Sequence, residues 1–320
     1  MNNFFSRTLI ATILAAPAVA YSQAIPITFD MNGTGGGQSF TVDVLDWLPG
    51  NVLSVGGQPD TGGLAVPPGT MLQTLYQANL GAVTLAGAPI ALAGTGGAQS
   101  FTAVAGFKEI VLAGSTLTNA RFGFNDLPVL SNTNFFYIYA GAFGNNLAGT
   151  GFAPVGGTIV MRGHVTDVLS SNFAIGSPPV VAPRLDNFGA NGHPGVQSIT
   201  GSGSTDLNVT IDFADAAYFP GFAVGQFKFS FFNTSVVTPF SQVDPSRVFS
   251  SNGLIDGDTA NNIGPVNGVS QPGQNLNFQF QGDANQSFSR LNVPEPGSLA
   301  LVGLALGALG FASRRAAKKS

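Results

Sequence analysis

The sequence of 320 residues contains no cysteine. Such a chain forms no disulfide bonds, iron–sulfur centres or cysteine-ligated zinc sites, so core packing and hydrogen bonds must stabilise its fold. Histidine is scarce too, since His164 and His193 are the two in the chain, which leaves little material for catalysis or metal binding. His193 lies in a turn-like sequence and His164 in an expected strand. We interpret both as surface or hydrogen-bonded residues and not as catalytic bases.

Charged residues make up 9% of the chain. The two terminal segments, residues 1–24 and 294–320, hold five of the 12 basic residues and one of the 16 acidic residues. The region between them therefore carries 7 basic and 15 acidic residues, a net charge of −8. A surface that binds a phosphate backbone needs clustered Lys and Arg. We expect no nucleic-acid partner.

Residues 1–24 have the features of a secretory signal peptide. A single positive charge, Arg7, precedes the apolar run TLIATILAA at residues 8–16, which is too short to span a bilayer. Small residues follow, and they allow signal peptidase to cleave after Ala20 or Ala24. The sequence therefore predicts export from the cytoplasm.

Residues 294–320 consist of three parts. The tripeptide Pro294-Glu295-Pro296 favours an extended, exposed backbone that a processing enzyme could grip. An uncharged run rich in Leu, Ala and Gly follows at residues 298–312, at the short end for a membrane-spanning helix. The last part is a basic cluster, which should stay cytoplasmic, as positive charge beside a membrane segment does: Arg314, Arg315, Lys318 and Lys319.

This order of tripeptide, apolar helix and basic stop resembles the PEP-CTERM signal, which exosortase reads in Gram-negative bacteria that make exopolysaccharide. The resemblance implies processing by signal peptidase and exosortase and a transient anchor in the inner membrane. The protein would then reach the cell surface or the extracellular matrix. The logic is that of a GPI signal, whose hydrophobic tail is removed. A plain C-terminal membrane anchor is the alternative.

The central region is rich in Gly, Phe, Val, Thr, Ser and Asn and poor in Glu, Lys and Arg, which disfavours helices and favours strands and turns. Apolar and polar residues alternate, as in half-buried strands, at residues 40–44, 208–213, 227–231 and 275–281. Residues 135–139, with the sequence FFYIY, are apolar on both faces and indicate a central strand.

Turn sequences rich in Gly and Pro recur between these runs. The predicted fold is therefore all-β: a jelly-roll-like β-sandwich between an N-terminal signal peptide and a short C-terminal hydrophobic helix. We expect one domain over residues 25–293, with residues 176–195 as a linker or long surface loop. The sequence GTGGGQSFT at residues 33–41 closely matches GTGGAQSFT at residues 94–102. We interpret the two as similar loop-to-strand entries and not as a solenoid repeat.

Common catalytic motifs are lacking: the sequence has no G-x-S-x-G, no P-loop and no H-E-x-x-H. Most carboxylates are aspartates beside turns. Asp212 with Asp215, and Asp256 with Asp258, could supply oxygen ligands to Ca²⁺, but neither pair fits an EF-hand loop, and stabilisation of turns explains them better. We expect no enzymatic activity and no cofactor.

Segments across the central region resemble the flocculation-associated PEP-CTERM proteins of floc-forming bacteria. That family implies a non-enzymatic role in the matrix, in which the exported protein helps cells to aggregate within their exopolysaccharide. The segments that carry the resemblance, in chain order, are residues 46–51 (DWLPGN), 75–80 (LYQANL), 101–107 (FTAVAGF), 134–139 (NFFYIY), 145–152 (NNLAGTGF) and 278–288 (FQFQGDANQSF).

A sugar-binding role makes Trp47 and Tyr76 candidate stacking platforms, although core packing is the stronger interpretation of both. Two further hypotheses of other classes stay open. One is a secreted carbohydrate-active enzyme, which needs two carboxylates across a cleft. The other is a matrix protein that forms fibres, suggested by the aromatic run at residues 135–139 and by the low charge.

Overall fold

The regular structure of the protein is β-strand, with no helix in the part of the chain that is described, and this confirms the all-β prediction. None of the described residues forms a helix long and apolar enough to cross a membrane. The predicted signal peptide up to residue 23 and the predicted hydrophobic helix lie outside the described residues. The computed structural model describes residues 24–34, 39–56, 67–90, 101–116, 119–124, 133–143, 154–175, 181–182, 185–188, 198–199, 201–224, 227–237, 240–246, 248–253 and 277–290.

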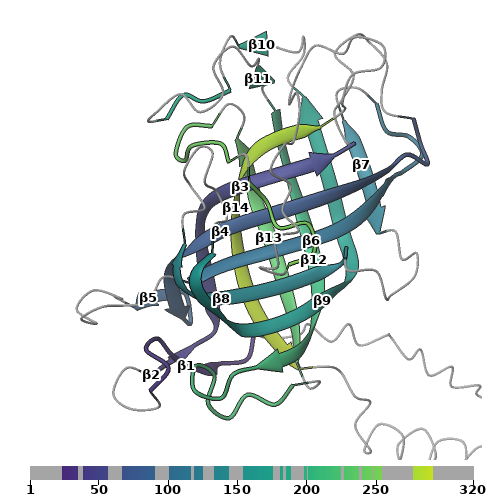
Figure 1. The fold of residues 1–320 in the computed structure, drawn as a ribbon. Coiled ribbons are helices and arrows are strands. Elements are labelled where there is room, and N and C mark those ends of the chain that lie inside the picture. Colours follow the sequence, from purple (N-terminus) through teal and green to yellow (C-terminus); the bar gives the residue numbers. More distant parts are fainter. Residues whose placement is uncertain are drawn as a thin grey trace, which may run out of the picture.

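Long strands build the main sheet (Figure 1). The long strands are β3 (Val44–Val55), β4 (Met71–Leu85), β6 (Phe101–Val111), β8 (Phe135–Phe143), β9 (Pro154–Ile175), β12 (Gly201–Ala214), β13 (Phe227–Val237) and β14 (Phe278–Arg290). The short strands are β1 (Ile27–Asp30), β2 (Ser39–Val42), β5 (Ala88–Ile90), β7 (Ala120–Phe124), β10 (Val181–Ala182) and β11 (Ser198–Ile199). Of the short strands, β5 and β7 pair with the main sheet, whereas β1–β2 and β10–β11 form separate two-stranded sheets.

The long strands form a closed, antiparallel sheet. Each pairs with the next long strand along the chain, from β3 through β4, β6, β8, β9, β12 and β13 to β14. The last strand then pairs with the first, with Phe278 opposite Ser54 and Ser287 opposite Val44. The result is an up-and-down cylinder, visible in Figure 1 as a continuous wall of strands.

This connectivity corrects one detail of the predicted fold. A jelly roll has Greek-key connections between two sheets, whereas the long strands here meander around one closed sheet. The alternation of apolar and polar residues identified the strands but carried no information on which strands pair. Closure also removes the exposed edges that an open sheet would present.

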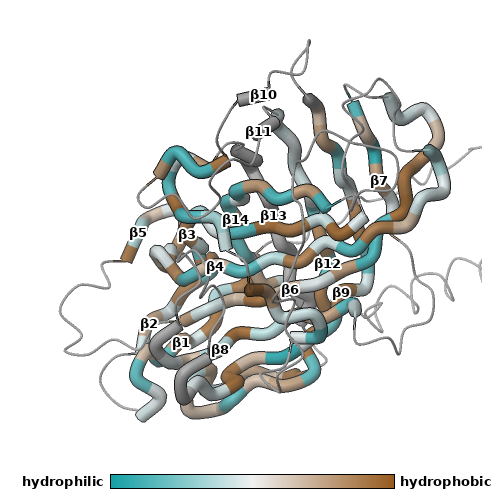
Figure 2. Tube along the Cα trace, turned by 45° about the horizontal axis from the view of Figure 1, so that its top comes forward, coloured by the Kyte–Doolittle hydropathy of each residue, from teal (hydrophilic) through white to brown (hydrophobic). Residues whose placement is uncertain are grey.

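Large apolar side chains fill the inside of the cylinder. Trp47, Tyr76, Phe107 and Phe136 are buried there with small residues such as Ala103, which leave room for the rings. An eight-stranded cylinder is just wide enough for side chains to fill. Figure 2 shows the corresponding succession of hydrophobic and hydrophilic residues along the strands.

One end of the cylinder is closed by the β1–β2 hairpin. Phe29 of β1 contacts Phe101 edge-on at 5.1 Å between ring centroids and stacks on Phe219 at 5.3 Å. In the hairpin turn, Asp30 Oδ1 accepts hydrogen bonds from the backbone of Asn32 and Gly33. The hairpin therefore covers this end as part of the same apolar core.

A second apolar cluster lies on the outer wall, beneath a segment that we call the strap (residues 240–246 and 248–253). Phe240, Val243 and Phe249 of the strap pack with Leu53, Leu75, Val104 and the outward rings of β8, together with Leu185. This explains the FFYIY sequence: Phe136 and Ile138 face the interior, whereas Phe135, Tyr137 and Tyr139 lie under the strap. The prediction of a strand covered on both faces is confirmed.

The two similar GTGG sequences also behave as predicted. β2 begins at Ser39, the second residue of the shared QSFT sequence, and β6 begins at Phe101, the third residue of that sequence. Each sequence therefore leads into a strand of different length and pairing, and the two do not form repeated units.

Candidate functional site

The outer surfaces of β9 and β12 carry a continuous row of polar side chains, which we call the polar face. None of the strap lies over it among the described contacts, and its members are exposed or half-buried. The polar face consists of Arg162, His164, Thr166, Ser170 and Asn172 on β9 and Ser204, Asp206, Asn208, Asp212 and Phe213 on β12.

Irregular pairing between β9 and β12 shapes this face. The register shifts at three points, which leaves Thr166, Leu169 and Asp212 without a directly opposed residue. An extra residue of this kind bends a strand and re-aims its side chain. Leu207, Val209 and Ile211 stay buried in the interior through these shifts, while the three extra residues are exposed. The bulges therefore add side chains to the outer surface without disturbing the core.

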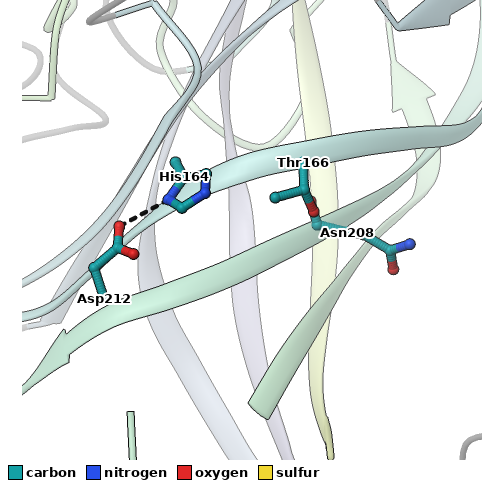
Figure 3. Close-up of polar contacts among 4 residues, drawn as sticks. All are labelled: His164, Thr166, Asn208 and Asp212. Carbon is teal, nitrogen blue, oxygen red and sulfur yellow. Dashed lines mark hydrogen bonds and ion pairs between the residues drawn. The ribbon is translucent and has the colours of Figure 1, made fainter. Parts of the chain in front are cut away.

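His164 and Asp212 form a polar contact on the face, with 2.8 Å between His164 Nδ1 and Asp212 Oδ2 (Figure 3). The Cα partner of His164 is Thr210, so Asp212 reaches it diagonally from the bulge. About a third of the His164 side chain and two-fifths of the Asp212 side chain are exposed. The prediction that His164 is a hydrogen-bonded strand residue is confirmed.

Cross-strand hydrogen bonds continue along the face. Thr166 Oγ1 donates to the backbone oxygen of Asn208, whose side chain points away from the His164–Asp212 pair in Figure 3. Ser170 Oγ donates to Asp206 Oδ2 at 2.7 Å. Hydroxyl, carboxylate, amide and imidazole groups thus line the surface in fixed positions.

The aromatic ring of Phe213 lies at one end of the polar face. Phe213 is 39% exposed, and the guanidinium of Arg162 lies 5.9 Å from its ring centroid. Sequence reasoning identified residues 208–213 as a strand but gave Phe213 no role. No local signal marked it, because Asp212-Phe213 continues the alternation of polar and apolar residues that begins at Asn208. Phe213 is exposed because the register shifts between Ile211 and Phe213, as at a bulge.

The structure places the two proposed stacking residues in the core, so neither can be a sugar platform. Trp47 is 1% exposed and Tyr76 is 3% exposed. The indole Nε1 of Trp47 donates to Gln286 Oε1 at 2.7 Å inside the cylinder. Core packing, the stronger interpretation from the sequence, is confirmed for both.

The aspartates considered as Ca²⁺ ligands serve other purposes where they are described. Asp212 pairs with His164, and Asp215 Oδ1 accepts a hydrogen bond from the backbone of Ala217, which stabilises a turn. Among the described residues, no group of three or more His, Asp or Glu side chains could hold a metal ion. Asp256, Asp258 and His193 lie outside the described residues.

Several carboxyl groups are buried away from the polar face. Burial raises the pKa of Glu109 inside the cylinder, against hydrogen bonds from Ser171 and Thr74 that lower it. Burial also raises the pKa of Asp46 and of Asp283 on the neighbouring strand, and the charge of Asp283 raises the pKa of Asp46 further. Each of these groups therefore keeps its proton to a higher pH than an exposed carboxyl group does.

The residues of the predicted sorting signal lie beyond the last described residue, Arg290. They are Pro294, Glu295 and Pro296 of the tripeptide and the basic residues Arg314, Arg315, Lys318 and Lys319. Of the two predicted cleavage positions, Ala20 is outside the described residues, and Ala24 is exposed at the start of the fold.

Comparison with known families identifies the C-terminal segment. Residues 292–316 match the PEP-CTERM protein-sorting motif. The chain is therefore an exported all-β protein, held transiently in a membrane by its C-terminus before processing. More particularly, it is a PEP-CTERM protein that exosortase sorts. No curated protein and no solved structure matches the chain significantly.

Proposed function

We propose that this protein is a cell-surface or matrix component that promotes cell aggregation together with exopolysaccharide, and that it acts by binding and not as an enzyme. The observation that carries the proposal is the PEP-CTERM motif at residues 292–316, which marks an exported protein for processing by exosortase. The sequence resemblance to flocculation-associated PEP-CTERM proteins supports the particular role.

The chemistry of the polar face supports a saccharide partner. Sugars present many hydroxyl groups, and each can donate and accept hydrogen bonds. The serine, threonine and asparagine side chains can do both, and the aspartate carboxylates can accept. The half-exposed ring of Phe213 offers an apolar surface for a sugar ring. Because these groups are held on two paired strands, little conformational entropy is lost when they bind.

A binding assay with the polysaccharide of the producing strain tests this proposal. The mature protein is mixed with purified exopolysaccharide, and the bound fraction is measured by co-sedimentation. Replacing His164 and Asp212 by alanine removes two hydrogen-bonding side chains, each worth about 1 kcal/mol. We therefore expect binding to weaken by about 2 kcal/mol, or about thirtyfold.

The control variant replaces Thr41 and Gln242, two exposed polar residues outside the polar face, by alanine. We expect this variant to bind as the natural protein does. Equal losses in the two variants would show that the polar face is not the contact surface. Depolymerisation of the polysaccharide by the pure protein would instead support the carbohydrate-active enzyme.

A further inference from the structure

The two ends of the described chain meet at one end of the cylinder. The backbone nitrogen of Ile25 donates to the backbone oxygen of Phe288 at 2.7 Å. Ala24, a predicted signal-peptidase site, directly precedes Ile25, and β14 ends at Arg290, two residues before the sorting motif begins at residue 292. The signal-peptide junction and the sorting signal therefore leave the fold at the same place.

Strand directions identify this place as the end closed by the β1–β2 hairpin. β14 arrives there with Arg290 opposite Phe227, the first residue of β13. The turn after β12 lies there too, where the backbone nitrogen of Asp30 donates to the oxygen of Tyr218 at 2.7 Å. Figure 1 shows β1 and β2 at this end and β10 and β11 at the opposite end of the cylinder. We call the two the hairpin end and the far end.

The length of the connecting chain keeps the hairpin end near the membrane. Eight residue steps separate Arg290 from Ser298, the first residue of the apolar run, and they span at most about 29 Å when fully extended. The cylinder itself is roughly 30–35 Å long, because the 13 residues of β14 rise about 3.3 Å each and are tilted by about 35–45° in a closed sheet. The far end therefore cannot lie against the bilayer while the hairpin end points away from it, because the connection is too short.

We propose that the hairpin end faces the lipid surface in the membrane-anchored precursor and that the far end points away from it. The inference rests on the sorting motif and the fold and is independent of the proposed role in aggregation. In this orientation the hairpin end is the part of the fold closest along the chain to the sorting motif, which begins at residue 292. The polar face runs along the side wall, from Asp212 nearer the hairpin end to Ser204 nearer the far end, and stays open to a partner.

Energy transfer to labelled lipid tests the orientation, and the absence of cysteine allows one probe to be placed at a time. Ala216 lies in the turn at the hairpin end and Ala113 in the β6–β7 turn at the far end, and both are exposed. Full-length A216C and A113C are labelled with the same fluorophore and reconstituted through their C-terminal segment into phosphatidylglycerol–phosphatidylethanolamine vesicles that carry an acceptor on the headgroups. We expect clearly stronger transfer from position 216. Equal transfer, or stronger transfer from position 113, would overturn the proposal.

A second pair of proteins tests whether the short connection causes the orientation. Twenty Gly and Ser residues are inserted between Arg290 and Leu291 in both labelled variants, which leaves the fold and both probes unchanged. A long flexible connection allows the cylinder to tumble, so the difference between the two probes should shrink. An undiminished difference would mean that the connection does not set the orientation, which contradicts the argument.

Discussion

Gly253 lies where the strap meets the aromatic rings of β8. Its φ of +82° is in the left-handed region, and a Cβ atom added there would overlap the rings of Tyr137 and Phe135. Its backbone oxygen accepts a hydrogen bond from the hydroxyl of Tyr139. The position therefore requires glycine for two separate reasons, conformation and space.

Replacing Gly253 by alanine should destabilise the protein more than the same change at Gly221. Gly221 has a similar φ of +75° but has nothing within 4 Å of an added Cβ, so G221A measures the backbone cost alone, about 1–2 kcal/mol. G253A adds the overlap with the rings, about 1–3 kcal/mol more. Urea denaturation of the two variants measures the difference. Equal losses would show that the strap yields without cost.

Glu109 is a carboxyl group inside the apolar cylinder. Thr74 Oγ1 donates to its Oε2 at 2.7 Å. Burial raises its pKa, so the folded protein holds the proton more tightly than the unfolded chain. This contribution to stability is complete below the unfolded pKa of roughly 4.3 and is lost as pH rises through the folded pKa.

A permanently neutral side chain at position 109 should remove this loss of stability at higher pH. E109Q is expected to gain thermal stability relative to the natural protein as pH rises from about 4 to about 7, and to gain little at the lower pH. Melting temperatures at both pH values measure this, with D167N at an exposed position as the control for the loss of one charge. A difference in melting temperature that is the same at both pH values would contradict the assignment.

At the scale of elements, the strap is fixed to the cylinder through amide side chains. Asn51 Oδ1 accepts from the backbone nitrogen of Ser246 at 2.7 Å, and Gln279 Nε2 donates to the oxygen of the same residue at 2.6 Å. Gln77 Nε2 donates to the oxygen of Val248, and Gln281 Oε1 accepts from two further backbone nitrogens of the strap. The amides satisfy backbone groups that have no strand partner.

Asn51→Ala should loosen the strap more than it disturbs the cylinder. It leaves the buried nitrogen of Ser246 without its acceptor, at a cost of about 1–3 kcal/mol. Hydrogen exchange should then become faster in residues 240–253 and stay slow in β3 and β4. The exposed Asn172→Ala is the matched control, and similar exchange in both variants would show that Asn51 does not hold the strap.

The burial of these amide side chains is a feature that the sequence could not predict. The alternation of Phe and Gln over residues 278–281 indicated a strand with one polar, solvent-facing side, and the strand is present. The glutamines are nevertheless buried, because the strap covers them. Alternation gives the two faces of a strand but does not reveal whether a distant segment covers the polar one.

Register could not be predicted either. The bulges between β9 and β12 arise from the combined demands of closing the sheet and keeping Val165 and Val168 inside it. They bring Asp212 to His164 and expose Phe213, so the polar face depends on pairing that no local sequence pattern specifies. The identity of the buried residues, including Trp47 and Tyr76, followed more directly from their apolar character.

At the scale of the whole molecule, the short C-terminal motif and the closed fold have separate roles. The motif takes the protein to exosortase, and the fold supplies a stable, cysteine-free body whose two ends lie together. Closure leaves no long sheet edge for pairing with other copies, which disfavours the fibre-forming alternative. The central region has a net charge of −8, spread over a large surface, so binding to matrix through neutral polar groups is favoured over binding through charge.

Floc settling in a strain that lacks this gene is the most direct measurement of the proposed function, with exopolysaccharide quantified in the same cultures. We predict that cells disperse while polysaccharide is still made and released, because the proposed role is to link cells to the matrix and not to synthesise it. The gene restored in full should return settling to the original rate, and a copy without Pro294-Glu295-Pro296 should not. Flocs that persist unchanged in the deletion strain would contradict the role in aggregation.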